Sequence, residues 1–358
     1  MPSTIKDVAK LSGVSIGTVD RVLHERGRVS AKTREAVLTA VKELDYRPSQ
    51  VARALVSNKN PLTLGITYPM VDRDFWQEAE IGIKAACSRL EVLGVRILVH
   101  PSPTYNIKDQ TAAIDALVEQ NVDGIILTAV DNSFSQKIDR HIPTEIPYAT
   151  VINDTTSGRR LFFLGPDDFS LGRLMAKLVQ LYLPAGCDLS ILAPNMSFSG
   201  TQQRISGFLS KINQNSLNIH VQRVFPIEAD STEASIQKNV HDAVKACLKD
   251  YSDLNALYIT NGLIEYAAEA LEKICPAGKV LLFGHEHSKN LERYIKAGTV
   301  AASIYQKPAQ EWYQAINMLY EYLIHSRSAL KPVYYSECSI IIKETLPFIK
   351  VGELDSLY

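Results

Sequence analysis

The chain opens with two short runs of apolar residues that recur at helical spacing around a glycine. The positions suited to one buried face are Ile5, Val8, Ala9, Leu11, Val14, Ile16, Val19, Val22 and Leu23. Gly13 permits a chain reversal, and Thr4 and Ser15 stand where helix N-caps are preferred. The pattern predicts a helix-turn-helix over 5–23, an arrangement that presents its second helix to the major groove of DNA. An ordinary helical hairpin would show the same apolar spacing.

A third helix and a short segment follow the first two. Ser30 is a suitable N-cap for a helix that runs to about residue 44. Its apolar stripe consists of Val37, Leu38, Val41 and Leu44. Pro48 ends the helical region, because the residue before a proline is pushed out of helical conformation. Residues 50–56 are too few for a stable isolated helix, and 57–61 mark a boundary.

From Leu62 onward, the pattern changes to alternating strands and helices. The expected strands are 62–68, 95–99, 124–127, 147–152, 160–164, 189–193, 219–224, 256–259, 280–283 and 334–342. The expected helices are 77–93, 109–120, 171–182, 200–214, 231–250, 264–274, 291–297 and 311–323. Repeated β-α units predict parallel sheets with helices on both faces. Two successive sets predict two lobes, each a doubly wound parallel sheet, behind an all-α headpiece.

Charge is distributed unevenly along the chain. Residues 1–60 carry eleven basic and six acidic residues, a net charge of +5, whereas the remainder carries 27 basic and 33 acidic residues, a net charge of −6. A basic module on an acidic body suits phosphate contacts, although a solvated basic face would look the same. No apolar run reaches 18 residues and no export signal stands at the start, so we expect no membrane partner and a cytoplasmic protein.

Signatures of catalysis and metal binding are absent from the sequence. The five cysteines are scattered and never in C-x-x-C spacing, which favours reduced thiols over a disulfide framework or a zinc site. There is no G-x-G-x-x-G, P-loop, G-x-S-x-G or H-E-x-x-H motif. His285-Glu286-His287 is a weak metal signal. We therefore expect no catalytic residue, no metal site and no cofactor.

Residues 4–57 resemble the headpiece of the lac repressor family. The resemblance rests on the helix-turn-helix, on the stretch 29–37 (VSAKTREAV), on Tyr46-Arg47-Pro48 and on the segment 51–55 (VARAL). It implies that 49–56 is a hinge that becomes helical on operator DNA. It also implies that Leu55 inserts into the minor groove, as apolar wedges do when they kink DNA. Without the resemblance, a plain linker would be the simpler interpretation.

The expected DNA contacts lie mainly at the start of the second helix. Ile16 and Gly17 occupy the first exposed positions, and Arg21 is the best candidate for a bidentate contact to guanine. Asp20 departs from the serine that is usual in the family, so its role stays open. The full set of expected DNA-binding residues is Thr4, Ser15, Ile16, Gly17, Thr18, Arg21, Ser30, Thr33, Arg34, Tyr46, Ser49, Ala52 and Leu55.

The rest of the chain resembles, more loosely, the ribose-type periplasmic binding-protein domain that serves this family as a sensor. In that fold the chain crosses between the lobes three times. The implied domains are a headpiece at 1–48, a hinge and linker at 49–61, an N-lobe at 62–158 and 308–328, and a C-lobe at 159–307 and 329–358. The resemblance also implies a homodimer on a near-palindromic operator.

A ligand in this fold lies between the lobes, at the carboxyl ends of the strands. The resemblance places aromatic residues there to stack on a sugar, an Arg-x-x-Gly-Phe element at 204–208, and polar residues near the crossings. Glu286 stands where relatives carry aspartate, and the aromatic pair could instead belong to the core. The expected ligand-binding residues are Phe75, Trp76, Asn153, Asp154, Arg204, Asn261, Glu286 and Gln306.

Aromatic faces with paired donors and acceptors suit a polyol, because an unmatched hydroxyl would leave buried polar groups unpaired. We therefore expect a transcriptional regulator, favouring a repressor, that is controlled by a small sugar or polyol. Three alternatives remain open: a regulator controlled by a partner protein, a solute-binding protein of a transporter, and a sugar-active enzyme. The residues do not name the effector or decide between induction and co-repression.

Overall fold

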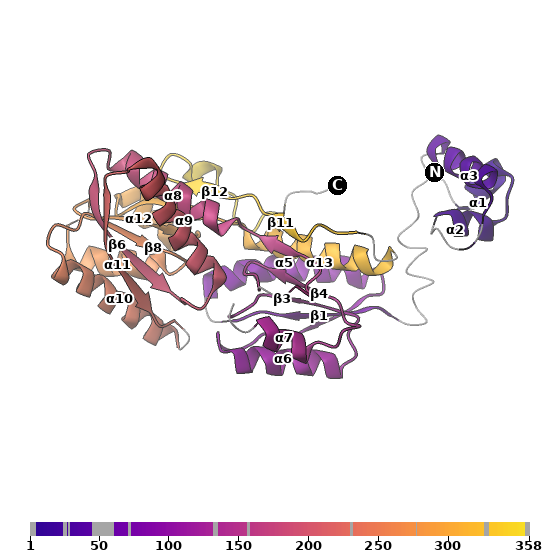
Figure 1. Ribbon diagram of the computed structural model, residues 1–358, viewed down its shortest axis with the longest axis horizontal. Helices are drawn as coiled ribbons and strands as arrows, with labels where there is room; N and C mark the ends of the chain where they lie inside the picture. The colour runs from indigo at the N-terminus through magenta and orange to yellow at the C-terminus, as the bar shows by residue number, and fades with distance from the viewer. Residues whose placement is uncertain are drawn as a thin grey trace.

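The computed structural model describes residues 5–23, 27, 29–44, 61–70, 73–131, 135–155, 158–229, 232–276, 278–325 and 329–354. It contains a helical headpiece and two α/β lobes, coloured along the chain in Figure 1. The segment that joins the headpiece to the lobes lies outside the described residues.

Three helices form the headpiece: α1 (Ile5–Ser12), α2 (Ile16–Leu23) and α3 (Ala31–Glu43). Gly13 adopts a φ of 68° between α1 and α2, a conformation that glycine takes without steric cost. The small core is made by Val8, Ala9, Val19, Val22, Val37 and Ala40. Leu11 and Leu38, which the pattern placed on the packed face, are 49% and 50% exposed. Three short helices cannot enclose every apolar residue that keeps the period.

The first lobe, or N-lobe, is built on a six-stranded sheet of order β11-β5-β4-β3-β1-β2, in which every pairing is parallel. Its strands are β1 (Thr63–Thr67), β2 (Arg96–Val99), β3 (Gly124–Leu127), β4 (Tyr148–Val151), β5 (Phe163–Gly165) and β11 (Val333–Tyr335). Its helices are α5 (Arg73–Glu91), α6 (Ile107–Glu119), α7 (Ser135–His141) and α13 (Pro308–Ile324). Helices α5 and α13 cover one face of the sheet, and α6 and α7 cover the other (Figure 1).

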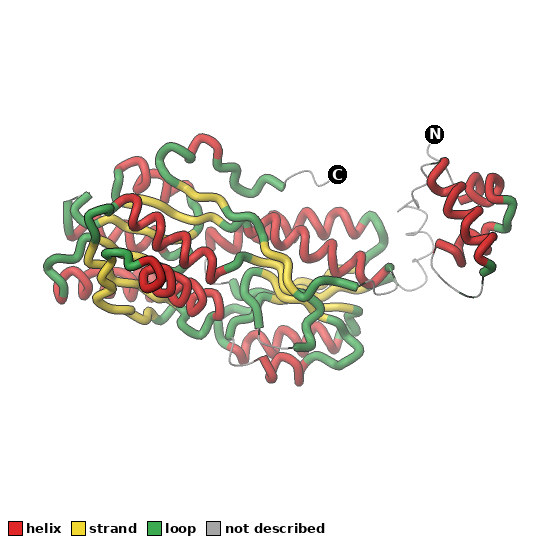
Figure 2. The backbone as a smooth tube through the Cα atoms, turned by 45° about the horizontal axis from the view of Figure 1, so that its top comes forward, coloured by secondary structure: helices red, strands yellow, loops and turns green. Residues whose placement is uncertain are grey.

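The second lobe, or C-lobe, repeats this plan with a sheet of order β12-β10-β9-β8-β6-β7. Its strands are β6 (Cys187–Pro194), β7 (Ile219–Ile227), β8 (Ala256–Ile259), β9 (Leu281–His285), β10 (Val300–Tyr305) and β12 (Ser339–Ile341). Its helices are α8 (Asp168–Tyr182), α9 (Ser199–Asn215), α10 (Glu233–Asp250), α11 (Ile264–Ile274) and α12 (Lys289–Ala297), followed by a 3-10 turn at Leu346–Phe348. Only the β10–β12 pairing is antiparallel among the described strands. In Figure 2 the strands, drawn in yellow, form one group in each lobe.

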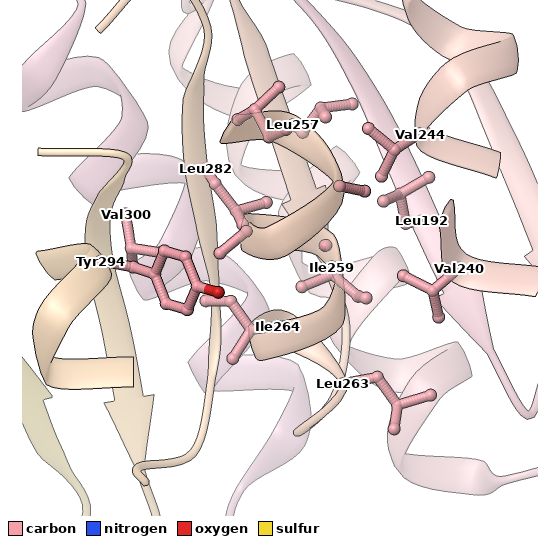
Figure 3. Close-up of a cluster of buried hydrophobic side chains, with 14 of the residues drawn as sticks. Leu192, Val240, Val244, Leu257, Ile259, Leu263, Ile264, Leu282, Tyr294 and Val300 are labelled. Carbon is pink, nitrogen blue, oxygen red and sulfur yellow. The ribbon is translucent and has the colours of Figure 1, made fainter. Parts of the chain in front are cut away.

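Apolar side chains fill both faces of each sheet, as doubly wound folds require. Figure 3 shows one of these clusters, in which Val240 and Val244 of α10 face Leu192, Leu257 and other side chains of the second sheet. Helices α8 and α9 pack on the opposite face of that sheet. The strand ends that face the first lobe are therefore held rigidly from both sides.

The strand pairings correct two of the expected domain boundaries. Residues 163–165 were expected in the C-lobe, but they pair with β4 as β5 of the N-lobe sheet. The single strand expected over 334–342 is two strands, β11 in the first sheet and β12 in the second. The first crossing therefore lies at 166–167, later than the expected boundary at 158–159. The third crossing lies at 336–338, within the stretch that was expected to be a single strand of the C-lobe. Hydrophobic periodicity cannot show this, because strands of either sheet have the same pattern.

The described residues also bear on membranes, metals and disulfides. None of their helices combines the length and apolar character that crossing a bilayer requires. In the same part of the chain, no three histidine, cysteine or acidic side chains stand together as metal ligands would. All five cysteines are free thiols.

Candidate functional site

The start of α2 is the exposed edge of the headpiece that the sequence singled out. Ser15 caps the helix, since its Oγ accepts a hydrogen bond from the Thr18 amide at 3.2 Å. Ile16 is 44% exposed, and Gly17 and Arg21 are also exposed. Nε of Arg21 donates to the Gly17 carbonyl at 3.1 Å. A bidentate contact to a guanine would use the other two guanidinium nitrogens.

The start of α3 presents a second capped helix end. Oγ of Ser30 accepts from the Thr33 amide at 3.2 Å and lies 2.8 Å from the Thr33 hydroxyl. The cap holds Arg34 in the first turn, where an arginine and a hydroxyl pair can meet phosphates. Five of the expected contacts lie outside the described residues: Thr4, Tyr46, Ser49, Ala52 and Leu55. The side chain of Asp20 is likewise outside them.

A cavity lies between the two lobes, at the carboxyl ends of their strands. Seven of the eight expected ligand residues line it: Phe75, Trp76, Asn153, Arg204, Asn261, Glu286 and Gln306. The sequence reasoning missed the remaining lining residues, which are Tyr105, Thr128, Ile152, Asp168, Asn195, Phe198, Gly200, Thr201, Thr260 and Gly262. Four of these, Thr128, Ile152, Asn195 and Thr260, follow a strand directly, so the end of each predicted strand was the signal available for finding them.

Arg204 is the polar centre of this cavity and is 7% exposed. Its Nε donates to Oδ1 of Asp168 at 2.6 Å, and its Nη1 donates to the Thr260 carbonyl at 2.9 Å. Its Nη2 donates to Oε1 of Gln306 at 3.3 Å. Burial raises the pKa of Asp168, and the Arg204 guanidinium offsets part of that rise. The arginine thus joins α8, α9 and the ends of β8 and β10 in one network.

Glycine residues allow α8 and α9 to approach closely enough for this pairing. A Cβ on Gly207 would lie 2.0 Å from the carbonyl oxygen of Phe169, and a Cβ on Gly172 would lie 2.0 Å from that of Arg204. The glycine of the Arg-x-x-Gly-Phe element is therefore a helix-packing residue. It places Arg204 against Asp168 without contacting the cavity.

Aromatic rings form one wall of the cavity. Trp76 is only 3% exposed and stacks on Tyr68, with ring centroids 5.1 Å apart, while its Nε1 donates to the Tyr105 hydroxyl at 3.3 Å. Phe75 is half-buried and meets Trp76 edge to face. Tyr105 of the N-lobe also contacts Phe198 of the C-lobe, with centroids 5.0 Å apart. Trp76 lines the cavity and also belongs to the N-lobe core, whereas its stacking on a sugar stays a prediction.

Asn153 connects the lobes. Its Oδ1 accepts from the Ser199 hydroxyl at 2.8 Å and from the Gly200 amide at 3.2 Å, while its Nδ2 donates to the Ala129 carbonyl. The N-lobe side chain therefore caps the first turn of α9. Much of its hydrogen-bonding capacity is already used by the protein.

Asp154 does not line the cavity, in contrast to its expected ligand role. Arg160 holds it through two hydrogen bonds, from Nε at 2.6 Å and from Nη2 at 2.7 Å. The Thr150 hydroxyl donates to the same carboxylate at 2.6 Å. Adjacent residues at a strand end face opposite ways. Asn153 reaches the cavity, and Asp154 becomes part of a structural ion pair.

Strained backbone conformations surround the cavity. Ile152, Asn195, Glu286 and Lys307 follow β4, β6, β9 and β10, and their φ values are 68°, 51°, 72° and 58°. Positive φ is costly for residues other than glycine and persists where the surrounding structure determines it. At Glu286, the amide donates to the Ile304 carbonyl at 2.8 Å and the carbonyl accepts from the Ser303 hydroxyl at 2.6 Å. This backbone fixes the Glu286 side chain at the cavity edge.

The chain thus combines a capped helix-turn-helix with two α/β lobes that enclose a polar and aromatic cavity. These features define a class, the DNA-binding regulatory proteins with a ligand-sensing domain. Comparison with known proteins agrees with this class. The model of the bacterial regulatory proteins of the lacI family matches residues 4–49, and the periplasmic binding protein domain matches residues 64–326. The chain belongs to the lacI family of regulatory proteins.

Two relatives and one solved structure illustrate the similarity. The chain is 30% identical over 254 residues to the HTH-type transcriptional regulator DegA of Bacillus subtilis, an alignment that covers 69% of this chain and 73% of that protein. It is 33% identical over 168 residues to the ribose operon repressor of Halalkalibacterium halodurans, covering 44% of this chain and about half (49%) of the repressor. A glucose-galactose binding protein, GanP of Geobacillus stearothermophilus, superposes with a TM-score of 0.71 at 24% identity. That superposition covers 80% of this chain and 100% of GanP, and it supports the fold alone.

Proposed function

We propose that this chain binds a specific operator sequence and that a small sugar or polyol bound between its lobes controls its affinity for that operator. The observation that carries the proposal is the buried Arg204–Asp168–Gln306 network beneath an aromatic wall. Both line a cavity at the ends of strands from the two lobes. Hydroxyl groups need paired donors and acceptors, and a sugar ring needs an apolar face. This cavity supplies both.

Operator recognition is assigned to the helix-turn-helix, with Arg21 reading a guanine and the capped starts of α2 and α3 meeting phosphates. The net charge of +5 on residues 1–60 supports phosphate contacts. We assign the headpiece to residues 1–48 and the hinge and linker to 49–61. Two copies of the chain would supply two headpieces for two half-sites, so the working form is a homodimer acting on chromosomal DNA in the cytoplasm.

Control of DNA binding requires the ligand to favour one arrangement of the two lobes. Three side-chain contacts already join the lobes near the cavity: Asn153 to Ser199, Tyr105 to Phe198, and Tyr305 to Glu78. A ligand held by Phe75 on one side and Arg204 on the other would add to these contacts. It would thereby change the free-energy difference between open and closed lobes.

The proposal is tested by following operator binding and sugar binding in the same preparation. Operator fragments are selected from random DNA, and calorimetry then measures a panel of sugars and polyols. We expect one compound to bind and to change operator affinity, with sedimentation giving a dimer. Operator binding without any bound sugar would favour control by a partner protein. Turnover of the bound sugar over hours would favour an enzyme.

A further inference from the structure

A second cavity adjoins the proposed effector cavity, also between the lobes. The two share Phe75, Gly262 and Glu286 as lining residues. The second cavity, here called the acidic bay, is lined by Asp74, Phe75, Glu233, Gly262, Leu263, Ile264, Glu265, Tyr266, Glu286, His287, Ser288, Asn290 and Leu291. A ligand in the effector cavity can therefore extend past Glu286 into the bay.

The charge of the combined cleft is strongly negative. Five carboxylates line the two cavities, those of Asp74, Asp168, Glu233, Glu265 and Glu286. Among the described residues, one cationic side chain lines them, that of Arg204, so the formal net charge is −4. Burial lowers the pKa of His287, which leaves this imidazole neutral at pH 7.

Arg204 is already committed to the protein. Its Nε, Nη1 and Nη2 all donate to protein acceptors, and the first of these is the buried carboxylate of Asp168 at 2.6 Å. Its charge is therefore balanced within the network. A phosphate or carboxylate entering the cleft would find no cation to receive it and would be repelled by Glu286.

The bay also contains a buried acceptor without a partner. The side chain of His287 is 4% exposed, and its Nε2 lies 3.4 Å from Oε1 of Glu292. Its Nδ1 has no hydrogen-bond partner among the described residues. In a neutral imidazole whose Nε2 donates to Glu292, Nδ1 carries a lone pair and accepts a hydrogen bond. Because this nitrogen is shielded from solvent, a donor on the ligand would reach it only if the His287 ring turned toward the bay that it lines.

We infer that the effector is an aminated polyol, such as an amino sugar, whose protonated amino group is held at Glu286 where the effector cavity meets the acidic bay. The inference rests on the proposed function and specifies its ligand. The ring would lie in the effector cavity, and the ammonium would face the carboxylates that line the bay. Neutral sugars would bind more weakly, and phosphorylated sugars would be excluded.

The test uses matched sets of sugars in which one substituent changes the charge. Calorimetry on the full-length protein compares glucose, galactose and mannose with their 2-amino derivatives and their 6-phosphates. We expect an amino sugar to bind about tenfold more tightly than its hydroxyl counterpart, the change that one charge-assisted hydrogen bond produces. The matching 6-phosphate should bind more weakly than either.

Variants show which carboxylate is responsible for the preference for the amino sugar. Glu286→Gln keeps nearly the same side-chain shape and should remove most of the preference for the amine. Asp74→Asn, on the exposed side of the bay, should reduce that preference. Asp242→Asn removes an equal charge from the exposed face of α10, where Asp242 pairs with Lys238 at 2.7 Å, and should leave the preference intact. A preference that survives Glu286→Gln would contradict the assignment.

Other outcomes separate the inference from the proposed function. Tight binding of a neutral or phosphorylated sugar, with no gain from the amine, would overturn the inference and leave a sugar-controlled regulator standing. Failure of every sugar to bind, with operator binding intact, would overturn both.

Discussion

Individual side chains of the cleft serve the protein and the proposed ligand at the same time. Asp168 and Gln306 both accept hydrogen bonds from Arg204, so the cavity floor is organised before a ligand arrives. Preorganised polar groups lose little entropy on binding. Seven of the expected ligand residues line the cavity because the resemblance supplied their positions. Asp168 was missed because its partner lies 36 residues away, a pairing that only the packing of α8 on α9 creates.

The base-reading role of Arg21 can be tested directly. Replacing Arg21 with alanine should reduce discrimination at one operator base pair by about 1–3 kcal/mol. Competition binding against single-base operator variants measures this effect. Equal losses on operator and unrelated DNA would show that Arg21 contacts phosphate instead.

The two aromatic residues are expected to behave differently. Trp76→Ala should lower the free energy of unfolding by about 3–5 kcal/mol, because the ring is buried against Tyr68 in the N-lobe core. Phe75→Ala should weaken sugar binding with a much smaller loss of stability, because its ring is only half-buried. Urea unfolding and calorimetry separate the two effects. Unchanged sugar affinity in Phe75→Ala would exclude stacking on that ring.

At the scale of elements, the spacing of the helices around the cavity depends on small residues. α8 and α9 touch backbone to backbone at Gly172 and Gly207, and this contact determines where Arg204 meets Asp168. Most helices and strands were evident from their apolar periods, including the capped starts of α2 and α3. The first turn of α8, with Asp167 as its N-cap, was not evident from the sequence, because an acidic pair after a strand also suits a loop.

Gly207→Ala tests this packing. The added methyl would meet the Phe169 carbonyl, and relief requires α8 and α9 to separate. We expect the free energy of unfolding to fall by about 1–3 kcal/mol and sugar affinity to fall with it. Asn213→Ala, on an exposed position of the same helix, is the control and should change neither quantity. A fully stable Gly207→Ala protein would show that the helices adjust freely.

At the scale of the whole molecule, the lobes are joined by a titratable contact as well as by the cavity. The Tyr305 hydroxyl of the C-lobe donates to Glu78 on α5 of the N-lobe. Burial raises the pKa of Glu78 from 4.5 to about 7, although the bond from Tyr305 opposes this rise. The state of this carboxyl therefore affects the contact between the lobes near neutral pH.

The expected pH dependence follows from that shift. Well below pH 4.5, Glu78 is protonated in both the folded and the unfolded chain, so it adds no pH dependence. As the pH rises toward 7, the unfolded chain loses this proton first, so stability falls by roughly 3 kcal/mol and then stays level.

Chemical unfolding across this range, comparing wild type with Glu78→Gln, measures the contribution. The difference between the two should decline between about pH 4.5 and 7. Glu119→Gln, at an exposed position on α6, serves as the control and should run parallel to wild type. A constant difference between wild type and Glu78→Gln would mean that the pKa of Glu78 is the same in the folded and the unfolded chain.

The sequence by itself determined the kinds of elements and their order, because helical and strand periods and helix caps are local properties of neighbouring residues. It also indicated the family, through the headpiece motifs and the Arg-x-x-Gly-Phe element. Only the tertiary structure decided which sheet β5 and β11 join, since both sheets select the same apolar pattern. It alone turned Asp154 toward Arg160, because the side-chain directions in the connection between β4 and β5 follow no period. It alone also brought Glu286 to the junction of two cavities, because their lining residues come from separate strands and helices.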